Sequence, residues 1–315
     1  MKRIVFLICV VLLVACQSNP GSTLVVGVLK GPSAISVSQW LDEGPVVNGK
    51  KLKIEIFDEP AALQAKMMQG KVDFAILPTT VAAILYNKGV DYRMVACPVQ
   101  SSVYVVSSDS IKSFDDLKGK EVSVSGQGTT PDVLFTLLAS KYSFRNKDLR
   151  LDYKIGNHSD MAQAMILGKV KTALLPEPFA TMVCSKNPSL KSSISLGDEM
   201  AKYDNKLLFA ITAFVARKAI VEHNRALIDS ISDRYQLAVQ WLHQNTSKAA
   251  DVVVKVGILP NRDIALKSIP RCNIHYLKVA DNAERISKYL QIFYSFDPKT
   301  VGGKLPDKRF YYGLK

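Results

Sequence analysis

One loop of the chain has the residue types expected of a small-molecule binding site. The segment Gly126–Thr130 reads Gly-Gln-Gly-Thr-Thr and is followed by Pro131. Two glycines let the backbone approach a ligand closely, and Pro131 suits the first turn of a helix, whose free N–H groups attract anions. The loop therefore predicts a cradle for a small molecule, with a preference for anionic groups. A tight turn in which a threonine caps its helix explains the same residues.

Three other loops follow predicted strands in the same way: Gly31–Ala34, Pro78–Thr80 and Pro176–Pro178. Ligands of open α/β sheets bind outside the carboxyl ends of the strands, so the four loops are expected to line one site. Glu177 stands between two prolines and is suited to accept a hydrogen bond from an amine or amide; a carboxylate that satisfies helix N–H groups is the structural alternative. The candidate ligand-binding residues are Pro32, Ser33, Thr79, Thr80, Gly126, Gln127, Gly128, Thr129, Thr130, His158 and Glu177.

His158 lies at another predicted junction between a strand and a helix, followed by Ser159 and Asp160. It is a candidate pocket histidine, but the favoured interpretation is a helix start capped by Ser159 or Asp160.

The sequence lacks the common catalytic motifs. The sequence has no G-x-S-x-G, H-E-x-x-H or P-loop pattern, and no cysteine is placed beside a histidine. Gly126-Gln127-Gly128 lacks the third glycine of the dinucleotide fingerprint, because Pro131 stands at that position. We therefore expect no enzyme activity, no metal and no cofactor.

The elements that would position these loops alternate between apolar β-rich runs and helical patterns, which is typical of βα units that feed a mostly parallel sheet. The order occurs twice along the chain. The predicted strands are 24–29, 52–57, 74–77, 121–125, 149–155 and 172–175. The predicted helices are one that follows the loop 31–34 and ends near 41, and those over 60–69, 80–88, 131–141 and 160–167.

An internal repeat supports two similar lobes. The segment 70–78 (GKVDFAILP) aligns without gaps with 168–176 (GKVKTALLP). In each copy a glycine ends a helix, a short apolar run forms a strand, and a proline ends the strand.

The pattern then changes. A β-like run covers 207–216, and a helix is predicted over 225–243, where apolar residues recur in steps of three and four. Two shorter helices are predicted at 249–256 and 283–293. The segments 102–107 and 207–216 are the natural connectors, so we expect two Rossmann-like α/β lobes crossed twice by the chain, with the helical C-terminal tail packed on lobe one. The predicted domains are 23–106 with 213–315 for lobe one and 107–212 for lobe two.

The N-terminus has the features of an export signal. Lys2 and Arg3 precede an apolar run from Ile4 to Ala15 that is too short to span a bilayer permanently. The end of this run, Leu13-Val14-Ala15-Cys16, resembles the lipobox of bacterial lipoproteins. We predict a signal peptide over 1–15, lipid modification of Cys16 and a flexible tether over 16–22; an ordinary signal peptide with an incidental cysteine is the alternative.

Charge and cysteine content exclude several classes of protein. The net charge of +13 falls to +11 without the signal, but the exported chain has no basic run or arginine-rich helix face, so nucleic acid is not an expected partner. Cys97, Cys184 and Cys272 remain, an odd number whose pairing the sequence does not determine, and at least one should be a buried free thiol.

Several motifs together resemble one known family. They include the loops described above, Phe114–Lys120 (FDDLKGK) and Val301–Pro306 (VGGKLP). The chain resembles the ABC-transporter substrate-binding proteins of the nitrate, sulfonate, taurine and thiamine-precursor family, over nearly all of its mature length.

This resemblance implies the type II periplasmic binding protein fold, in which a small molecule is held between two lobes that close by a hinge. The partners implied are a ligand (anionic, sulfonate or pyrimidine-like), an ABC permease and a membrane reached through Cys16. The chain would be a lipid-anchored extracytoplasmic monomer. The alternative is an enzyme on the same fold, of the menaquinone-pathway or pyrimidine-synthesis type, with the cleft as its active site.

Overall fold

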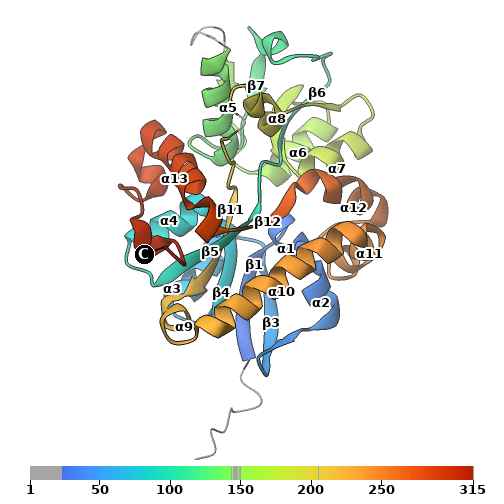
Figure 1. Ribbon diagram of the computed structural model, residues 1–315. Helices are drawn as coiled ribbons and strands as arrows, with labels where there is room; N and C mark the ends of the chain where they lie inside the picture. Colours follow the sequence, from blue (N-terminus) through green and yellow to red (C-terminus); the bar gives the residue numbers. More distant parts are fainter. Residues whose placement is uncertain (1–22, 143, 145–147, 149, 205, 315) are drawn as a thin grey trace, which may run out of the picture.

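The computed structural model describes residues 23–142, 144, 148, 150–204 and 206–314. The predicted signal peptide and the tether with Cys16 lie outside these residues. Two α/β lobes are stacked along the long axis of the molecule, with the C-terminus on the lower lobe (Figure 1). Within the described residues, no helix has the length and apolar character needed to cross a membrane.

Each lobe is built on its own mixed sheet. Lobe one has seven strands in the order β12-β5-β11-β4-β1-β3-β2, and lobe two has five in the order β10-β6-β9-β7-β8. The strands are β1 (Thr23–Leu29), β2 (Val46–Val47), β3 (Lys50–Phe57), β4 (Phe74–Pro78), β5 (Tyr92–Val99), β6 (Val103–Ser107), β7 (Glu121–Ser123), β8 (Arg150–Asp152), β9 (Thr172–Pro176), β10 (Lys191–Ser195), β11 (Thr212–Arg217) and β12 (Ile274–Lys278).

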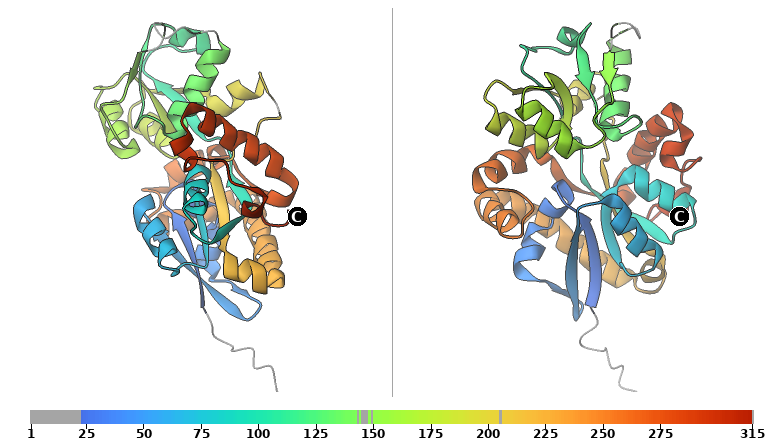
Figure 2. Two further views of the ribbon diagram at one scale, coloured as in Figure 1. Left: turned by 90° about the vertical axis from the view of Figure 1, so that its left-hand side faces the viewer. Right: turned by 180° about the vertical axis from the view of Figure 1, so that it is seen from behind.

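Helices cover both faces of each sheet, as the views from the side and from behind show (Figure 2). The α-helices are α1 (Pro32–Ile35), α2 (Ser38–Glu43), α3 (Pro60–Met68), α4 (Thr79–Asn87), α5 (Thr130–Lys141), α6 (His158–Ile166), α7 (Phe179–Lys186), α8 (Leu196–Ala201), α9 (Lys218–His223), α10 (Arg225–Gln244), α11 (Thr246–Lys255), α12 (Arg262–Ser268) and α13 (Val279–Phe296). Short 3-10 turns include η1 (Phe114–Leu117), η3 (Ile269–Cys272), η4 (Pro298–Val301) and η5 (Lys308–Phe310).

The central strands have apolar residues at every position because both faces of the sheet are covered. In β4, Phe74 and Ile76 pack into the core beneath α2, α10 and α11, while Ala75 and Leu77 pack into the core on the opposite face. This alternation follows from the two-residue period of a strand.

The predicted two-lobe α/β fold is confirmed, but more of the strand pairs are antiparallel than predicted. The pairs β1–β3, β1–β4, β7–β8 and β7–β9 are parallel, as βα units require. The strands that follow the crossings, β6 and β11, run antiparallel to their neighbours β9 and β4, so each sheet is mixed rather than simply parallel.

The crossings themselves are placed differently from the prediction. Residues 103–107 form β6 inside the sheet of lobe two, so the first crossing is the short segment Gln100–Ser102. In the predicted run 207–216, only Thr212 onward is a strand, because the preceding residues pass between the lobes and form local turns. The bonds from Ala210 N to Leu208 O and from Ile211 N to Phe209 O replace a sheet ladder.

The first predicted helix was expected to follow the loop 31–34 and to end near 41. Instead, most of that loop lies in α1, and the helical segment is broken into α1 and α2. Ser36 lies at the break, where its hydroxyl donates to Ser33 O at 2.6 Å and lies 2.5 Å from the Tyr235 hydroxyl. A serine that bonds to the local backbone competes with helix continuation. The predicted strand 149–155 is reduced to β8, and its first residue, Leu149, lies outside the described residues.

The C-terminal helices pack mainly on lobe one, as predicted. Leu227, Ile231, Tyr235, Ala238 and Leu242 of α10 are all buried against its sheet. In addition, α12 contacts α7 of lobe two and α13 contacts α5, so the tail touches the upper lobe on two sides of the crossings (Figure 1).

Candidate functional site

The predicted loops lie where the two lobes face each other. The loop after β1 and the loop after β9 approach across the gap: a Cβ built on Gly31 would lie 4.0 Å from Cδ of Pro178. Beside them, Thr79 N at the start of α4 donates to Ile211 O of the second crossing at 3.0 Å. We call Gly31–Ser33, Thr79–Thr80, Ser125–Thr130, His158 and Pro176–Pro178 the interlobe loops.

The glycines of the loop Gly126–Thr130 adopt the conformations that a tight turn requires. Gly126 has φ +94° and Gly128 has φ +73°, values that disfavour other residues. The Thr129 hydroxyl donates to Gly126 O at 2.8 Å, so its proton is used in a hydrogen bond within the turn. Thr129 is the N-cap of α5, but its side chain makes no capping hydrogen bond.

Asp132, which the sequence analysis did not select, completes this loop. Its Oδ2 accepts from Gly128 N at 2.8 Å, and its Oδ1 accepts from the Tyr153 hydroxyl at 2.7 Å. The carboxylate is buried. The sequence did contain a signal for it, because Thr129-x-x-Asp132 has the spacing of a capping box, in which the fourth residue reaches back to the helix start.

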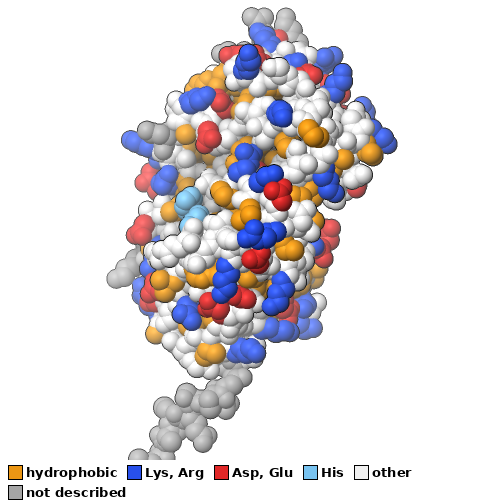
Figure 3. All heavy atoms as spheres, turned by 90° about the vertical axis from the view of Figure 1, so that its right-hand side faces the viewer, with side chains coloured by type: hydrophobic (Ala, Val, Ile, Leu, Met, Phe, Trp, Pro, Cys, Tyr) orange, Lys and Arg blue, Asp and Glu red, His pale blue; other side chains and the backbone are white. Residues whose placement is uncertain are grey.

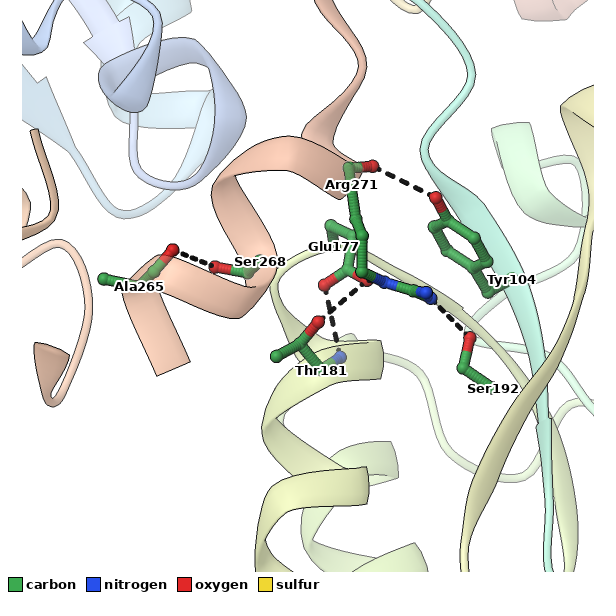
Figure 4. Close-up of polar contacts among 7 residues, drawn as sticks. All are labelled: Tyr104, Glu177, Thr181, Ser192, Ala265, Ser268 and Arg271. Atoms are coloured by element: carbon green, nitrogen blue, oxygen red, sulfur yellow. Dashed lines mark hydrogen bonds and ion pairs between the residues drawn. The ribbon is translucent and has the colours of Figure 1, made fainter. Parts of the chain in front are cut away.

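Glu177 belongs to an interlobe cluster rather than to an open site (Figure 4). Its Oε1 accepts from Thr181 Oγ1 at 3.0 Å and from Arg271 Nε at 2.5 Å, and its Oε2 accepts from Thr181 N at 3.2 Å. Burial raises the pKa of the Glu177 carboxyl, and the Arg271 guanidinium opposes that rise. The structural alternative for Glu177, a carboxylate that satisfies helix N–H groups, therefore describes its contacts.

Arg271 reaches from η3 of lobe one into lobe two. Its Nη2 donates to Ser192 Oγ of β10 at 2.6 Å, and its guanidinium carbon lies 4.0 Å from the centre of the Tyr104 ring in β6. The Tyr104 hydroxyl in turn donates to Arg271 O at 3.2 Å. No local pattern could have indicated this pair, because Arg271 and Glu177 are separated by 94 residues.

His158 is the first residue of α6 and is held in apolar surroundings. Its ring lies 5.9 Å from the Phe179 ring, its Nδ1 is buried without a protein partner, and burial lowers its pKa to about 4. The favoured prediction of a cap at Ser159 or Asp160 is wrong, because the N-cap is Asn157, whose side chain accepts from Asp160 N at 2.8 Å. Asn157 has the extended backbone typical of an N-cap, whereas Ser159 and Asp160 are already inside the helix.

Several buried hydroxyls near the lobe interface have no hydrogen-bond partner among the described residues. They include those of Thr79, Ser125 and Thr212, together with Ser101 in the first crossing and Tyr289 on α13. Thr212 pairs with Pro78 across the sheet, and Ser125 precedes Gly126. A buried hydroxyl without a partner costs roughly 1–3 kcal/mol, so such groups call for a ligand or water. Only Thr79 among them was selected from sequence; Ser125 and Thr212 carry no local signal.

The remaining candidates differ in exposure. Ser33 is buried, Pro32 and Thr80 are half-buried, and Gln127 is exposed. Thr130 begins α5, on the side of lobe two that contacts α13.

Other hollows of the molecule lie away from these loops. A cavity of about 610 Å³ is lined by the amino ends of the lobe-two strands, including Lys120, Arg150 and Thr172. Another of about 320 Å³ lies beside the crossings, next to Ser101 and Phe209. On the face drawn in Figure 3, basic and acidic side chains are interspersed.

The described side chains form neither a metal-ligating cluster nor a disulfide. In the part of the chain that the structure describes, no three His, Cys, Asp or Glu side chains gather as metal ligands. Cys97, Cys184 and Cys272 are free thiols, and Cys97 and Cys272 are buried, which confirms the expected buried free thiol.

Comparison with known proteins gives this geometry its context. Residues 39–235, more than half of the chain, match a family described as ABC transporter, phosphonate, periplasmic substrate-binding protein. No curated protein matches the chain.

Several solved structures are similar in fold to this chain. An ABC transporter structure from Parabacteroides distasonis is 29% identical, with 92% of this chain and 98% of that chain covered and a TM-score of 0.81. The periplasmic aliphatic sulphonate binding protein SsuA of Escherichia coli is 16% identical, with 93% of both chains covered and a TM-score of 0.73. The periplasmic nitrate-binding protein NrtA of Synechocystis PCC 6803 is 12% identical, with 89% and 84% covered and a TM-score of 0.60. The chain therefore belongs to the phosphonate family of periplasmic substrate-binding proteins of ABC transporters.

Proposed function

We propose that the chain captures a small molecule between its two lobes, closes on it by a hinge at the two crossings, and delivers it to the permease of an ABC importer. The observation that carries this proposal is the set of buried, unpartnered hydroxyls of Thr79, Ser125 and Thr212, which lie where loops of the two lobes meet. A ligand that bonds to both lobes favours the closed state by its differential affinity.

The two crossings are suited to act as the hinge. Gln100–Ser102 is short, and residues 202–211 contain no strand in their described part. A few loop residues of this kind can absorb the change of backbone angles when lobes close, as in periplasmic binding proteins. On this proposal the lobes keep the predicted bounds, 23–106 with 213–315 for lobe one and 107–212 for lobe two, except that residues 103–106 of β6 move from lobe one to lobe two.

The proposal also includes lipid modification of Cys16, which would hold a monomer at a membrane outside the cytoplasm. Its support is the sequence pattern at 13–16. Cys16→Ser should release the protein from the membrane fraction while the soluble body still folds, since the tether has no core residue. Unchanged membrane retention would contradict the anchor.

An enzyme on the same fold is not favoured. The matched family consists of transport proteins, and the carboxylates Asp132 and Glu177 are engaged by protein groups rather than free for acid–base chemistry.

The test uses the ligand that the protein carries through purification, identified by native mass spectrometry and then titrated by calorimetry. Thr79→Val removes a buried hydroxyl that has no protein partner, so the ligand-free variant should be as stable as wild type or more stable. Its dissociation constant for the ligand should rise about 2- to 13-fold if one neutral hydrogen bond is lost.

Thr246→Val is the matched control, because Thr246 lies on α11 and bonds to Leu242 O. It should leave the affinity unchanged. Equal affinity for wild type and Thr79→Val would contradict the proposed place of the ligand.

A further inference from the structure

We propose that the lower end of lobe one is a membrane-docking surface that rests on anionic lipid headgroups. The inference goes beyond ligand capture, and it rests on the proposed function in one respect, the lipid modification of Cys16. We call the following exposed residues the basal surface: Thr23, Val46, Lys51, Met68, Lys71 and Lys88.

The basal surface lies at the end of lobe one that is farthest from the interlobe loops. β1 and β4 run side by side from this end to the loops at Gly31–Ser33 and Thr79–Thr80 (Figure 1). Thr23, the first residue of β1, pairs with Lys51 of β3, and Lys51 also pairs with Val46 of β2. A membrane at this end therefore leaves the interlobe loops accessible to a ligand.

The other residues of the basal surface lie on the opposite side of β1. Asp73 N donates to Val25 O at 2.9 Å, so Lys71, two residues earlier, lies beside the start of β1. Lys88 and Met68 line the same hollow of about 310 Å³. The basal surface thus extends to both sides of the point at which the chain enters β1.

The proposed anchor would keep this end of the protein near a membrane. Seven residue steps join Cys16 to Thr23. A fully extended chain spans at most about 3.3–3.6 Å per residue, so Cys16 lies within about 25 Å of Thr23. A lipid on Cys16 would therefore hold the basal surface, rather than lobe two, close to the headgroups. The tether would favour even a weak contact, because it raises the effective concentration of the basal surface at the bilayer.

Three lysines of the basal surface are not neutralised by the protein. The ammonium groups of Lys51, Lys71 and Lys88 make no hydrogen bond or ion pair with another residue that the structure describes. We call these three residues the basal lysines. Each basic residue near an anionic membrane surface increases the partition coefficient about fivefold.

The acids next to the basal lysines are already paired with other cations. Asp73 Oδ1 accepts from Arg217 Nη2 at 2.6 Å, and Asp91 Oδ1 lies 3.9 Å from Lys218 Nζ. The basal lysines therefore give this end of the molecule an excess of positive charge, which complements an anionic bilayer.

Two apolar side chains lie among the basal lysines. Met68 and Val46 are 63% and 59% exposed, among the most exposed large apolar side chains of the described residues. At a bilayer, lysines keep their ammonium groups at the headgroups, while their stems and neighbouring apolar side chains enter the boundary with the acyl chains. One acyl chain alone binds a membrane only marginally, so a basic surface beside it stabilises the anchor.

Vesicle sedimentation tests the basal surface without the anchor. The mature chain with Cys16→Ser is mixed at about 10 mM salt, where the Debye length is about 30 Å, with vesicles of phosphatidylcholine alone or of equal parts phosphatidylcholine and phosphatidylglycerol. It should bind only the vesicles that contain phosphatidylglycerol. At physiological salt the Debye length falls to about 8 Å, so this variant should still leave the membrane fraction, as expected above. Binding to neither kind of vesicle, or equal binding to both, would overturn the inference.

Substitution of the basal lysines locates the contact. Lys51→Gln, Lys71→Gln and Lys88→Gln, combined in the Cys16→Ser chain, should lower its partition coefficient on the anionic vesicles at least tenfold, because each lysine contributes about fivefold. All three side chains are exposed, so thermal unfolding should be unchanged.

The matched control removes the same charge from lobe two. Lys141, Lys169 and Lys186 are also exposed, and their ammonium groups have no partner in the described part of the chain. Their combined replacement by Gln should lower the partition coefficient by less than about twofold, because lobe two faces away from the bilayer and distant charges are screened. Equal losses in the two triple variants would show that the net charge of the whole chain binds the lipid, and would overturn the inference.

The docking surface and the proposed function fail in different ways. Unchanged membrane retention of Cys16→Ser would contradict the anchor, whereas the vesicle binding of that variant decides the basal surface by itself. Failure of the basal surface would leave both the anchor and ligand capture intact.

Discussion

Glu177 and Arg271 join the two lobes through one buried charge pair. Glu177 lies in the loop after β9 of lobe two, and Arg271 lies just before β12 of lobe one. The Glu177 side chain is fully buried and Arg271 is about one-third exposed, with side-chain exposures of 0% and 35%. Removing one partner of such a pair leaves an uncompensated charge, which costs more than the pair contributes when intact.

A double-mutant cycle on this pair should show strong coupling. Glu177→Gln should lower the free energy of unfolding by about 2–3 kcal/mol, below the range for a fully buried pair because Arg271 is partly solvated. Adding Arg271→Met should restore part of that loss. The measurement is chemical denaturation of the four proteins.

The control cycle uses Asp263 and Lys267, an exposed pair on the neighbouring helix α12, which should couple by only about 0.3–0.5 kcal/mol. Equal coupling in the two cycles would mean that the Glu177 pair is a surface interaction without a role in holding the lobes.

His158 should make stability depend on pH in one direction. Its folded-state pKa is lowered from the ordinary value of 6.5 to about 4, so between these values the unfolded state binds more protons. Its contribution is fully present above pH 6.5 and is lost as pH falls toward 4. Between pH 7.5 and pH 4.5 this amounts to about 2–3 kcal/mol.

Chemical denaturation at these two pH values, for wild type and His158→Gln, isolates the contribution of His158 to the pH dependence of the free energy of unfolding. The variant should lose about 2–3 kcal/mol less than wild type on acidification, because glutamine does not titrate. Parallel losses in the two proteins would show that His158 is protonated without cost in the folded state.

Local sequence patterns identified some residues of the site and missed others for a physical reason. Thr79 and Glu177 stand directly after strands, where loop position alone indicates an interlobe role. Arg271 and Thr212 acquire their roles through contacts with distant segments, which no local spacing encodes. The sequence also did not show whether the Glu177 carboxylate is free to bind a ligand, because this depends on its ion pair with the distant Arg271.

At the scale of elements, the bounds of strands and helices were predicted well where burial imposes a periodic pattern of apolar residues. β4 and α10 have periodic apolar residues because a sheet or a core covers them, and both were found close to their observed bounds. The crossings were misplaced because Val103–Ser107 and 207–211 are both apolar. Pairing with β9 makes the first a strand, and the lack of a neighbouring strand prevents the second from forming one.

The loop that opens α5 offers a matched test of backbone strain. Gly126 has φ +94°, and a Cβ there would lie 3.1 Å from Thr129 Cγ2, whereas Gly128 has φ +73° with nothing within 4 Å. Gly128→Ala should cost about 1–2 kcal/mol for the left-handed backbone alone. Gly126→Ala should cost about 1 kcal/mol more, because the Thr129 methyl must also move. Thermal and chemical denaturation of both variants measure the difference, and a smaller cost at Gly126 would contradict the described turn.

At the scale of the molecule, the internal repeat explains why two lobes present similar ends to each other. In both copies a βα unit ends in a proline-containing loop, and the two copies end in Pro78 and Pro176 at the lobe interface. The relative placement of the lobes depends on contacts outside the repeat, chiefly those of α12 with α7 and of α13 with α5. Those contacts could not be read from the repeat itself.

Small-angle scattering of the mature protein, with and without its carried ligand, tests the central claim most directly. If a ligand draws the lobes together at the two crossings, the radius of gyration falls on saturation. At a ligand concentration near the wild-type dissociation constant, Thr79→Val should show a smaller fall, because it binds more weakly. Identical dimensions with and without saturating ligand, while calorimetry shows that the ligand is bound, would contradict closure of the two lobes around it.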